Sequence, residues 1–231
     1  MEESTLHKPN AVIAEAFVEY ALRIGALELD PEGRPLKSGR LSPYFFNSGL
    51  FCTGDSIAKL ARAYASVIID EKFHPDVIFG PAYKGISLAA TIVAALGGDI
   101  GYAYNRKEMK NHGDGGIVAG APLDGKRVLI VDDVMTTGSS SDEAVEIIRA
   151  HGGTSIGCCI AFDRRERAEN STSLAVPQFE KKFNIPVHSV ATVADLTSFL
   201  KKTTKGSYGD SIFRGKMIGK ILAYQKLYGA L

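Results

Sequence analysis

The chain has 231 residues, with 27 Lys and Arg against 26 Asp and Glu, and 45% of its residues are hydrophobic. This length fits one domain, or one domain with a small addition, and the composition excludes a disordered, collagen-like or disulfide-built chain. The formal net charge of +1 argues against a general binder of nucleic acids or membrane surfaces. The three cysteines lack the spacing of metal ligands and predict reduced thiols in a cytosolic protein.

The sequence has no pattern typical of a membrane span or a secretory signal. The longest strongly apolar stretch, residues 86–96, is too short to cross a bilayer and ends at Gly97 and Gly98. The first residues include Glu2 and Glu3 and lack a basic segment followed by an apolar core. We therefore expect a cytoplasmic protein with no membrane partner.

The N-terminal part of the chain predicts two helices separated by a small flap. Apolar residues recur at helical spacing over residues 9–27, and Gly25 lies near the expected end of this helix. Residues 27–54 are short apolar pieces broken by Pro and Gly, which predicts a small antiparallel flap beside the main body. Asp55 is expected to cap the next helix, whose apolar face spans residues 57–68.

From residue 77 onward, short apolar runs alternate with helical patterns. Strands are expected at residues 77–79, 100–104, 127–131, 156–162 and 186–191, and helices at residues 85–96, 139–151 and 212–228. This alternation implies right-handed crossovers and a mostly parallel sheet with helices on both faces. Such sheets bind ligands at the carboxyl ends of their strands. We expect one domain over residues 1–231, with a C-terminal helix within residues 208–231.

Residues 128–141 are the most informative segment. Four apolar residues lead into Asp132 and Asp133, followed by a loop of small hydroxyl residues around Gly138 and then a helix. Backbone N–H groups at the start of that helix form an anion site, and the carboxylates can accept hydrogen bonds from vicinal sugar hydroxyls. A plain turn with a capping serine has the same pattern. The spacing matches neither a P-loop nor a dinucleotide-binding turn.

Four further segments combine unusual residues. Residues 37–46 read Lys-Ser-Gly-Arg-Leu-Ser-Pro-Tyr-Phe-Phe, and residues 80–85 read Gly-Pro-Ala-Tyr-Lys-Gly. Residues 105–116 hold four basic side chains, those of Arg106, Lys107, Lys110 and His112, and three glycines. Residues 162–167 read Phe-Asp-Arg-Arg-Glu-Arg at a strand end. Taken singly, these segments have ordinary interpretations as flap core, turn, solvated loop and exposed charge run. Lys84, however, begins a helix against the preference of the helix dipole, which favours a bound anion.

In this order, the five segments resemble the motifs of the type I phosphoribosyltransferases, and the likeness extends from the first helix to the last. Residues 128–141 are similar to the family's signature for phosphoribosyl pyrophosphate (PRPP), and residues 162–167 are similar to the members that act on orotate. The resemblance implies the type I phosphoribosyltransferase fold: α/β, a mostly parallel central sheet flanked by helices, and a small N-terminal hood or flap. It also implies transfer of the 5-phosphoribosyl group from PRPP to orotate in de novo pyrimidine biosynthesis.

The resemblance further implies roles for the matching residues. PRPP is expected to contact Lys37, Tyr83, Lys84, Arg106, Lys107, Lys110, His112, Asp132, Asp133, Thr136, Thr137, Gly138, Ser139 and Ser140. Residues 105–116 match a flexible lid that closes over the substrates, often on the partner subunit's site. Lys110, with His112 nearby, is the expected general acid to the leaving oxygen. Asp132 and Asp133 are expected to hold the ribose hydroxyls.

For orotate, the resemblance implies contacts from Lys37, Phe45, Phe46, Thr136 and Arg164. An aromatic pair suits a flat heterocycle. The planar guanidinium of Arg164 suits bidentate binding of the orotate carboxylate.

The resemblance also implies a cofactor and a partner. Mg²⁺ is expected to bind mainly through PRPP, with no direct protein ligands, and a homodimer is expected to share the lid between subunits. No nucleic-acid partner is expected. Two departures are visible: the family loop more often reads Thr-Ala-Gly-Thr at residues 136–139, and the chain is slightly extended around residues 202–212.

Two other functions remain open at this point. A purine phosphoribosyltransferase would have no role for Arg164 and no flap with Lys37 and the Phe pair. A regulatory protein that kept the fold but lost catalysis would be expected to degrade the basic lid or gain a basic nucleic-acid face.

Overall fold

The computed structural model describes residues 9–36, 38–110, 116–136, 139–168, 171–204, 208 and 210–229, with only the backbone of residues 109 and 110. Its elements are α1 (Ala11–Arg23), β1 (Leu27–Pro35), β2 (Leu41–Phe46), η1 (Ser48–Leu50), α2 (Gly54–Asp70), β3 (Val77–Phe79), α3 (Lys84–Leu96), β4 (Gly101–Lys110), β5 (Gly116–Gly120), β6 (Arg127–Asp132), α4 (Ser139–Ala150), β7 (Thr154–Asp163), α5 (Ala175–Phe183), β8 (Val187–Thr192), α6 (Val193–Lys202) and α7 (Ser211–Tyr228). Within these ranges, no helix is both long and apolar enough to span a membrane.

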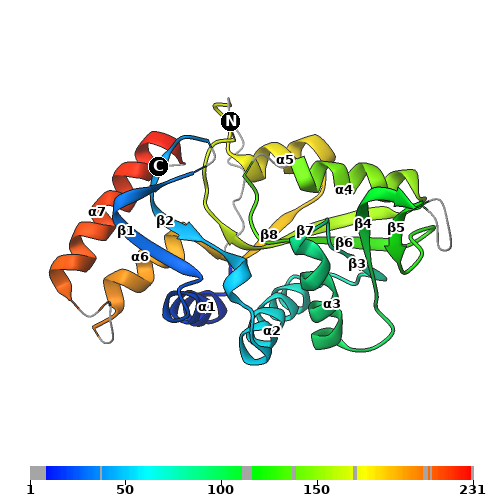
Figure 1. Cartoon of the computed structure of the whole chain (residues 1–231), viewed down its shortest axis with the longest axis horizontal. Helices are drawn as coiled ribbons and strands as arrows, with labels where there is room; N and C mark the ends of the chain where they lie inside the picture. Colours follow the sequence, from blue (N-terminus) through cyan, green and yellow to red (C-terminus); the bar gives the residue numbers. More distant parts are fainter. Residues whose placement is uncertain are drawn as a thin grey trace.

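The central sheet has six strands in the order β5-β4-β3-β6-β7-β8, and all neighbouring pairs are parallel except β4 with β5. Helices α4 and α5 cover one face, and α1, α2 and α3 cover the other (Figure 1). Alternate residues of β6 enter the two cores: Leu129 and Val131 face the α1–α2 side, and Val128 and Ile130 face the α4–α5 side. This alternation explains the continuous apolar run of β6. The predicted mostly parallel α/β fold is confirmed.

The flap region forms a separate two-stranded sheet. Strands β1 and β2 pair antiparallel, with Leu27 opposite Phe46. In Figure 1 this small sheet lies between α7 and the central sheet. The ring of Phe46 stacks on Phe162 of β7, with centroids 5.7 Å apart, and also packs near Phe17 and Phe51. An aromatic core therefore anchors the flap to the end of β7.

Three features differ from the expectations for the sequence. Strand β4 continues to Lys110 and pairs with the unexpected strand β5, so the first half of the expected lid is part of a hairpin. Helices α5 and α6 were also not expected. The N-cap of α2 is Thr53 rather than Asp55, because Thr53 and Ser56 form a reciprocal capping box. Asp55 instead lies in the first turn, where its charge suits the helix dipole.

The loop between β3 and α3 is unusually tight. A Cβ atom added to Gly80 would lie 1.8 Å from the carbonyl oxygen of Gly85, so the two glycine backbones are in direct contact. The Gly80 N–H donates to the carbonyl of Ala103 at 2.9 Å, which fixes the loop to β4. The Ala82–Tyr83 peptide bond is cis. This geometry makes Lys84 the first residue of α3, directly above the carboxyl end of β3.

We expect Gly80→Ala to lower the free energy of unfolding by about 1–3 kcal/mol or more, because the added methyl overlaps backbone atoms that have no room to move. Gly54→Ala is the matched control, since an added Cβ at Gly54 meets nothing within 4 Å. Urea unfolding of both variants measures the difference. Equal stability of the two variants would contradict the close packing of this loop.

Candidate active site at the carboxyl edge of the sheet

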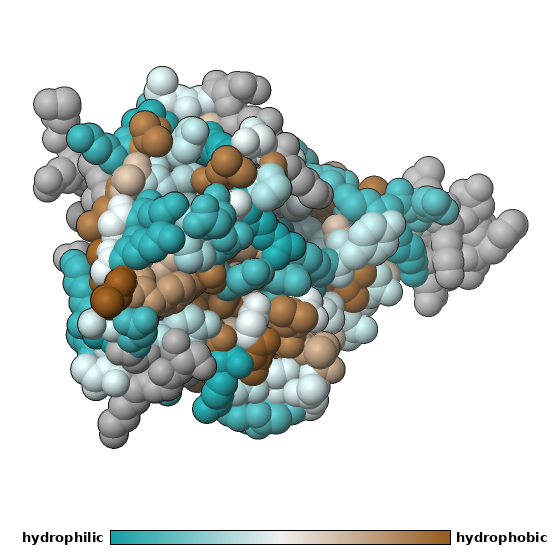
Figure 2. Space-filling view, turned by 60° about the vertical axis from the view of Figure 1, so that its left-hand side comes forward, coloured by the Kyte–Doolittle hydropathy of each residue, from teal (hydrophilic) through white to brown (hydrophobic). Residues whose placement is uncertain are grey.

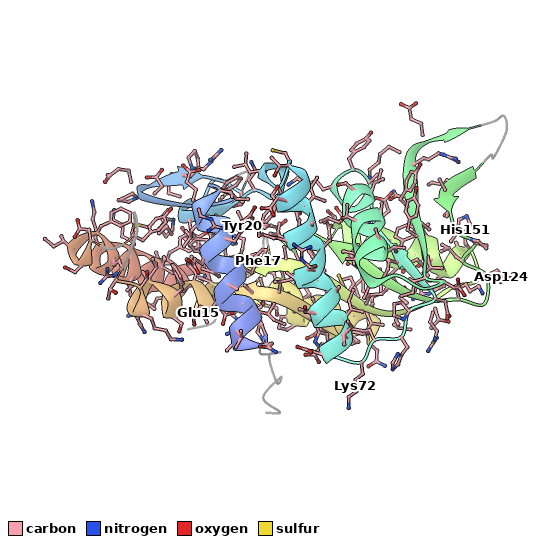
Figure 3. The ribbon with its side chains drawn as sticks, turned by 90° about the horizontal axis from the view of Figure 1, so that it is seen from below. Glu15, Phe17, Tyr20, Lys72, Asp124 and His151 are labelled. Atoms are coloured by element: carbon pink, nitrogen blue, oxygen red, sulfur yellow. The ribbon has the colours of Figure 1, made fainter. Side chains whose placement is uncertain are left out.

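The sequence-predicted residues converge on one edge of the central sheet. Asp132 is the last residue of β6 and Asp133 directly follows it, Arg164 directly follows β7, and Lys84 begins the helix that follows β3. Parallel strands place their carboxyl ends at the same edge, which explains why residues distant in sequence meet there. The opposite edge holds the loops that contain Lys72, Asp124 and His151, which are labelled in Figure 3.

Asp133 is the most densely bonded of these residues. Its Oδ2 atom accepts a hydrogen bond from Ser48 Oγ at 2.7 Å and lies 2.6 Å from Lys84 Nζ. Its Oδ1 atom accepts from the Val134 N–H at 2.9 Å. The Asp133 side chain is buried, and these three donors replace the water that its charge loses. Asp133 therefore has a fixed orientation and holds the Lys84 ammonium at the site.

Asp132 has a different environment. Its Oδ1 atom accepts from the Asp133 N–H at 2.9 Å, and its backbone carbonyl accepts from Tyr64 Oη at 2.6 Å. Burial, with the charge of Asp133 as a second cause, raises the pKa of Asp132 to about 7, although the Asp133 N–H and Lys84 act in the opposite direction. The two adjacent carboxyls therefore differ: Asp133 is held by a lysine, and Asp132 binds a proton near neutral pH.

The hydroxyl-rich loop lies between β6 and α4. Thr136, Ser139 and Ser140 are exposed, and α4 begins at Ser139. Thr137 and Gly138 lie outside the described residues. An exposed helix N-terminus with small side chains is suited to a phosphate group, because the free N–H groups and the helix dipole both favour negative charge.

The loop after β3 presents a cation and an aromatic ring. Tyr83 is 74% exposed, and the side chain of Lys84 is 56% exposed despite its pairing with Asp133. The unfavourable position of Lys84 at a helix start is thus offset by a carboxylate from β6. Asn105, which is 1% exposed, accepts a hydrogen bond from the Ala82 N–H at 2.8 Å and holds the loop to β4. The anchoring of this loop by Asn105 was not predicted from the sequence. An Asn within a strand is a signal for such a role, because a buried amide needs a hydrogen-bond partner.

The hairpin of β4 and β5 carries the other predicted basic residues. It projects from the body of the molecule (Figures 1 and 2). Arg106 Nη1 donates to the carbonyl of Gly116 across the hairpin at 3.0 Å, and Lys107 Nζ pairs with Glu143 of α4 at 3.1 Å. The side chain of Lys110 and the whole of His112 lie outside the described residues.

The flap places its two phenylalanines on opposite faces of β2. Phe46 is part of the core, whereas Phe45 lies under the guanidinium of Arg34, with Cζ 4.2 Å from the ring centroid. Successive strand residues point in opposite directions, so one flat base cannot stack on both rings. Lys37 lies outside the described residues.

Arg164 is 5% exposed and already has protein partners. Its Nε donates to Glu166 Oε1 at 2.9 Å, and its Nη2 donates to Ser42 Oγ at 2.9 Å. Its Nη1 makes only a long contact, 3.4 Å, with the carbonyl of Tyr44. Ser48 and Glu166 therefore join the site as residues that sequence reasoning missed. Ser48 is the second residue after the flap motif of residues 37–46, and Glu166 is the carboxylate within the Arg-rich segment.

Among the residues that the structure describes, no group of three or more His, Cys, Asp or Glu side chains could hold a metal ion. The oxygen donors at this edge are the paired carboxylates of Asp132 and Asp133. Mg²⁺ favours this type of ligand, one or two carboxylates that act together with substrate phosphates.

The chain is similar to known proteins over most of its length. The model of the phosphoribosyl transferase domain matches residues 53–192. The chain is 47% identical over 227 residues to the orotate phosphoribosyltransferase of Bordetella avium, covering 94% of this chain and 98% of that one, and 47% identical over 224 residues to that of Nitrosococcus oceani, covering 95% and 94%. The crystal structure of orotate phosphoribosyltransferase from Francisella tularensis is 38% identical, with a TM-score of 0.79, and covers 93% of this chain and 100% of that chain.

The pKa of Asp132 predicts a pH dependence of stability. The folded state holds this proton up to about pH 7, whereas the ordinary value is 3.8. The unfolded chain releases the proton first, so the free energy of unfolding should fall as pH rises between these values, by a few kcal/mol in total. Asp132→Asn should abolish this component. Urea unfolding from pH 5 to pH 8 measures it.

Asp76→Asn is the matched control for this measurement. Arg127 lowers the pKa of Asp76 to about 2, so its contribution is lost only as the solution becomes strongly acidic. Between pH 5 and pH 8 the Asp76→Asn variant should parallel the parent protein. Parallel curves for Asp132→Asn and the parent would refute the raised pKa of Asp132.

Proposed function

The chain belongs to the phosphoribosyl transferase family, and within it to the orotate phosphoribosyltransferases, and from this premise we propose how its residues act. It transfers the 5-phosphoribosyl group from PRPP to orotate, which gives orotidine 5′-phosphate and pyrophosphate in pyrimidine biosynthesis. The observation that carries the proposal is the meeting of Lys84, Asp132 and Asp133 at one sheet edge, beside the exposed start of α4. Each of these groups corresponds to one part of PRPP.

We propose that the 5′-phosphate binds the loop of residues 136–140 at the N-terminus of α4, including Thr137 and Gly138. The supporting observation is the exposure of Thr136, Ser139 and Ser140 at that helix start. Asp132 is proposed to accept hydrogen bonds from the ribose hydroxyls, because its neighbour Asp133 already accepts three donors from the protein. Asp133 then acts mainly by fixing Lys84 through its carboxylate and the side chain of Asp132 through its backbone N–H.

We propose that the diphosphate binds beside Tyr83 and Lys84. Displacement at the anomeric carbon proceeds through an oxocarbenium-like state, in which negative charge grows on the leaving pyrophosphate. Lys84 and the hairpin residues Arg106, Lys107 and Lys110 are proposed to stabilise that charge. Lys110, with His112, is proposed to protonate the leaving oxygen. As PRPP binds, Lys107 has to exchange Glu143 for a phosphate oxygen.

The pair of carboxyls at the end of β6 fits the oxygen chemistry of Mg²⁺, and the described residues contain no cage for the metal. We therefore propose that Mg²⁺ is carried mainly by PRPP, with Asp132 and Asp133 facing it. When bound, the metal would neutralise charge on the diphosphate.

For orotate, we propose the space between the flap and the end of β7. Arg164 supplies the positive charge for the orotate carboxylate, and its weakly bonded Nη1 is the group most easily given to a substrate. Lys37 and Thr136 are proposed to contact the ring. The base is proposed to lie against one face of β2 only. Phe45 is then the candidate for direct contact with the base, and Phe46 packs in the core on the other face of the strand.

We propose a homodimer in which the hairpin of one subunit serves the site of the other. The supporting observation is the hairpin of β4 and β5, which projects from the rest of the molecule at the upper right of Figure 3. A cytoplasmic location is supported by the three cysteines, Cys52, Cys158 and Cys159, which form no disulfide.

A base-competition assay tests the function. On addition of PRPP and Mg²⁺, the absorbance of orotate should fall, while adenine, hypoxanthine and uracil, assayed in parallel, should remain. Consumption of adenine or hypoxanthine instead would favour the purine enzyme. Tight binding of PRPP by isothermal titration without any turnover would favour the regulatory protein.

Lys110→Ala should lower kcat by about 100- to 1000-fold, because one positioned acid or cation is lost from the transition state. The melting temperature should stay unchanged, as should both properties in the control Lys126→Ala, an exposed lysine before β6. Unchanged turnover in Lys110→Ala would exclude the lid mechanism.

The same variant tests sharing of the hairpin. A mixture of Lys110→Ala and Asp132→Asn should recover activity that neither has alone, because a mixed dimer then contains one site with both residues intact. A mixture that stays inactive after subunit exchange would show that each hairpin serves its own subunit.

A further inference from the structure

A buried polar cluster joins the end of β7, the flap and the C-terminal helix. Arg164 and Glu166 lie at its centre, with side chains that are 6% and 11% exposed. Their closest contact, Nη2 to Oε1, is 2.7 Å, and Nε donates to the same oxygen at 2.9 Å. The Cζ atom of Arg164 also lies 4.5 Å from the ring centroid of Tyr44. The guanidinium is therefore held on one edge by a carboxylate and on one face by an aromatic ring.

Glu166 is in turn held from α7. Tyr224 Oη donates to Glu166 Oε2 at 3.0 Å, and Tyr44 Oη donates to Glu166 Oε1 at 3.0 Å. Gln225 Nε2 donates both to Tyr44 Oη and to the backbone carbonyl of Arg164, each at 2.9 Å. One turn of α7 therefore bonds to Glu166 and Tyr44, which hold the guanidinium of Arg164, and also to the backbone carbonyl of Arg164.

The backbone of the same region is also joined to α7. The Arg167 N–H donates to the carbonyl of Tyr228 at 2.7 Å, and Glu166 forms a bridge with Gly229. The end of α7 and its C-cap residue Gly229 therefore bond to Arg164, Glu166 and Arg167 in the segment that follows β7. In Figure 1, α7 lies beside β1 and β2, on the side of the flap away from the central sheet.

The two arginines and one glutamate of the cluster carry a net positive charge. Arg164 and Glu166 cancel, and Arg40 of the flap lies 3.5 Å from Glu166 Oε2 as a second cation. Burial and the charge of Glu166 raise the pKa of Tyr224 to about 12, so its hydroxyl remains a donor to Glu166. Two arginines around one carboxylate therefore leave one positive charge that an anionic substituent on a ring can balance.

We propose that α7 is a specificity element of the substrate site: Tyr224 and Gln225 fix Glu166 and Tyr44, and these fix the guanidinium of Arg164 for pyrimidines that carry a carboxylate. This inference rests on the proposed contact between Arg164 and orotate. Glu166, Tyr224 and Gln225 are positioning residues, because they act through Arg164 and not on the substrate. Their loss should weaken orotate binding and leave the PRPP site, at the ends of β3 and β6, unaffected.

Two variants test the positioning role. Tyr224→Phe removes one hydroxyl and should raise KM for orotate about 3- to 10-fold, and Glu166→Gln should raise it about 10- to 100-fold. In both variants, KM for PRPP should change less than about twofold. Tyr228→Phe is the matched control: it lies one turn later on α7, and among the described residues its hydroxyl has no hydrogen-bond partner.

The outcomes separate this inference from the proposed function. Arg164→Lys keeps the charge beside Glu166 but loses the planar fork, so it should raise KM for orotate alone. If Arg164→Lys does so while Tyr224→Phe and Glu166→Gln do not, α7 has no positioning role and the proposed orotate site stands. If Arg164→Lys leaves KM for orotate unchanged, the proposed contact itself fails. Equal rises in both KM values with a lower melting temperature would show that α7 only stabilises the fold.

Discussion

The carboxylate of Asp133 is the interaction on which the arrangement of the site depends. Through its two oxygens it joins Ser48 after the flap, Lys84 at the start of α3 and the backbone of Val134. Its backbone carbonyl accepts N–H groups from Ala161 and Phe162 of β7. Four separate parts of the chain meet at this one residue. Since each bond is to a charged or buried group, a shift of any part is resisted by all the others.

Adjacent identical residues can thus have different roles. The Asp133 carboxylate accepts three protein donors, whereas the Asp132 side chain accepts one and keeps more of its hydrogen-bonding capacity at the sheet edge. The same division recurs at the other end of the site, where Glu166 accepts hydrogen bonds from Arg164, Tyr44 and Tyr224, and Arg164 keeps one weakly bonded nitrogen. In both places a residue with many protein partners orients a neighbour with fewer. The chemistry of the site therefore depends on residues that need not touch a substrate.

Sequence patterns predicted those parts of the protein that local physics determines. Strand β6 and helix α4 follow from an apolar run and from helical spacing. An anion site between them stays a prediction. The extension of β4 was not predictable in this way, because its charged residues are held by pairing with β5. The start of helix α6 is visible in the sequence as a capping box, which Thr192 at the end of β8 forms with Asp195. The hydrogen bonds of Ser48 with Asp133, of Tyr224 with Glu166 and of Gln225 with Tyr44 join residues 85, 58 and 181 positions apart. No local pattern encodes such pairs.

The pairing of the cations at rest has a consequence for selectivity among anions. Lys84 is bound to Asp133, Lys107 to Glu143, and Arg164 to Glu166. A cluster of unpaired lysines would concentrate any small polyanion from solution, including inorganic phosphate and free nucleotides. Here a ligand gains only the difference between its own contacts and the internal pairs that it replaces. Negative charge alone therefore gives a ligand little affinity for this site. A molecule that also supplies sugar hydroxyls and a base of matching shape binds more tightly than one that does not.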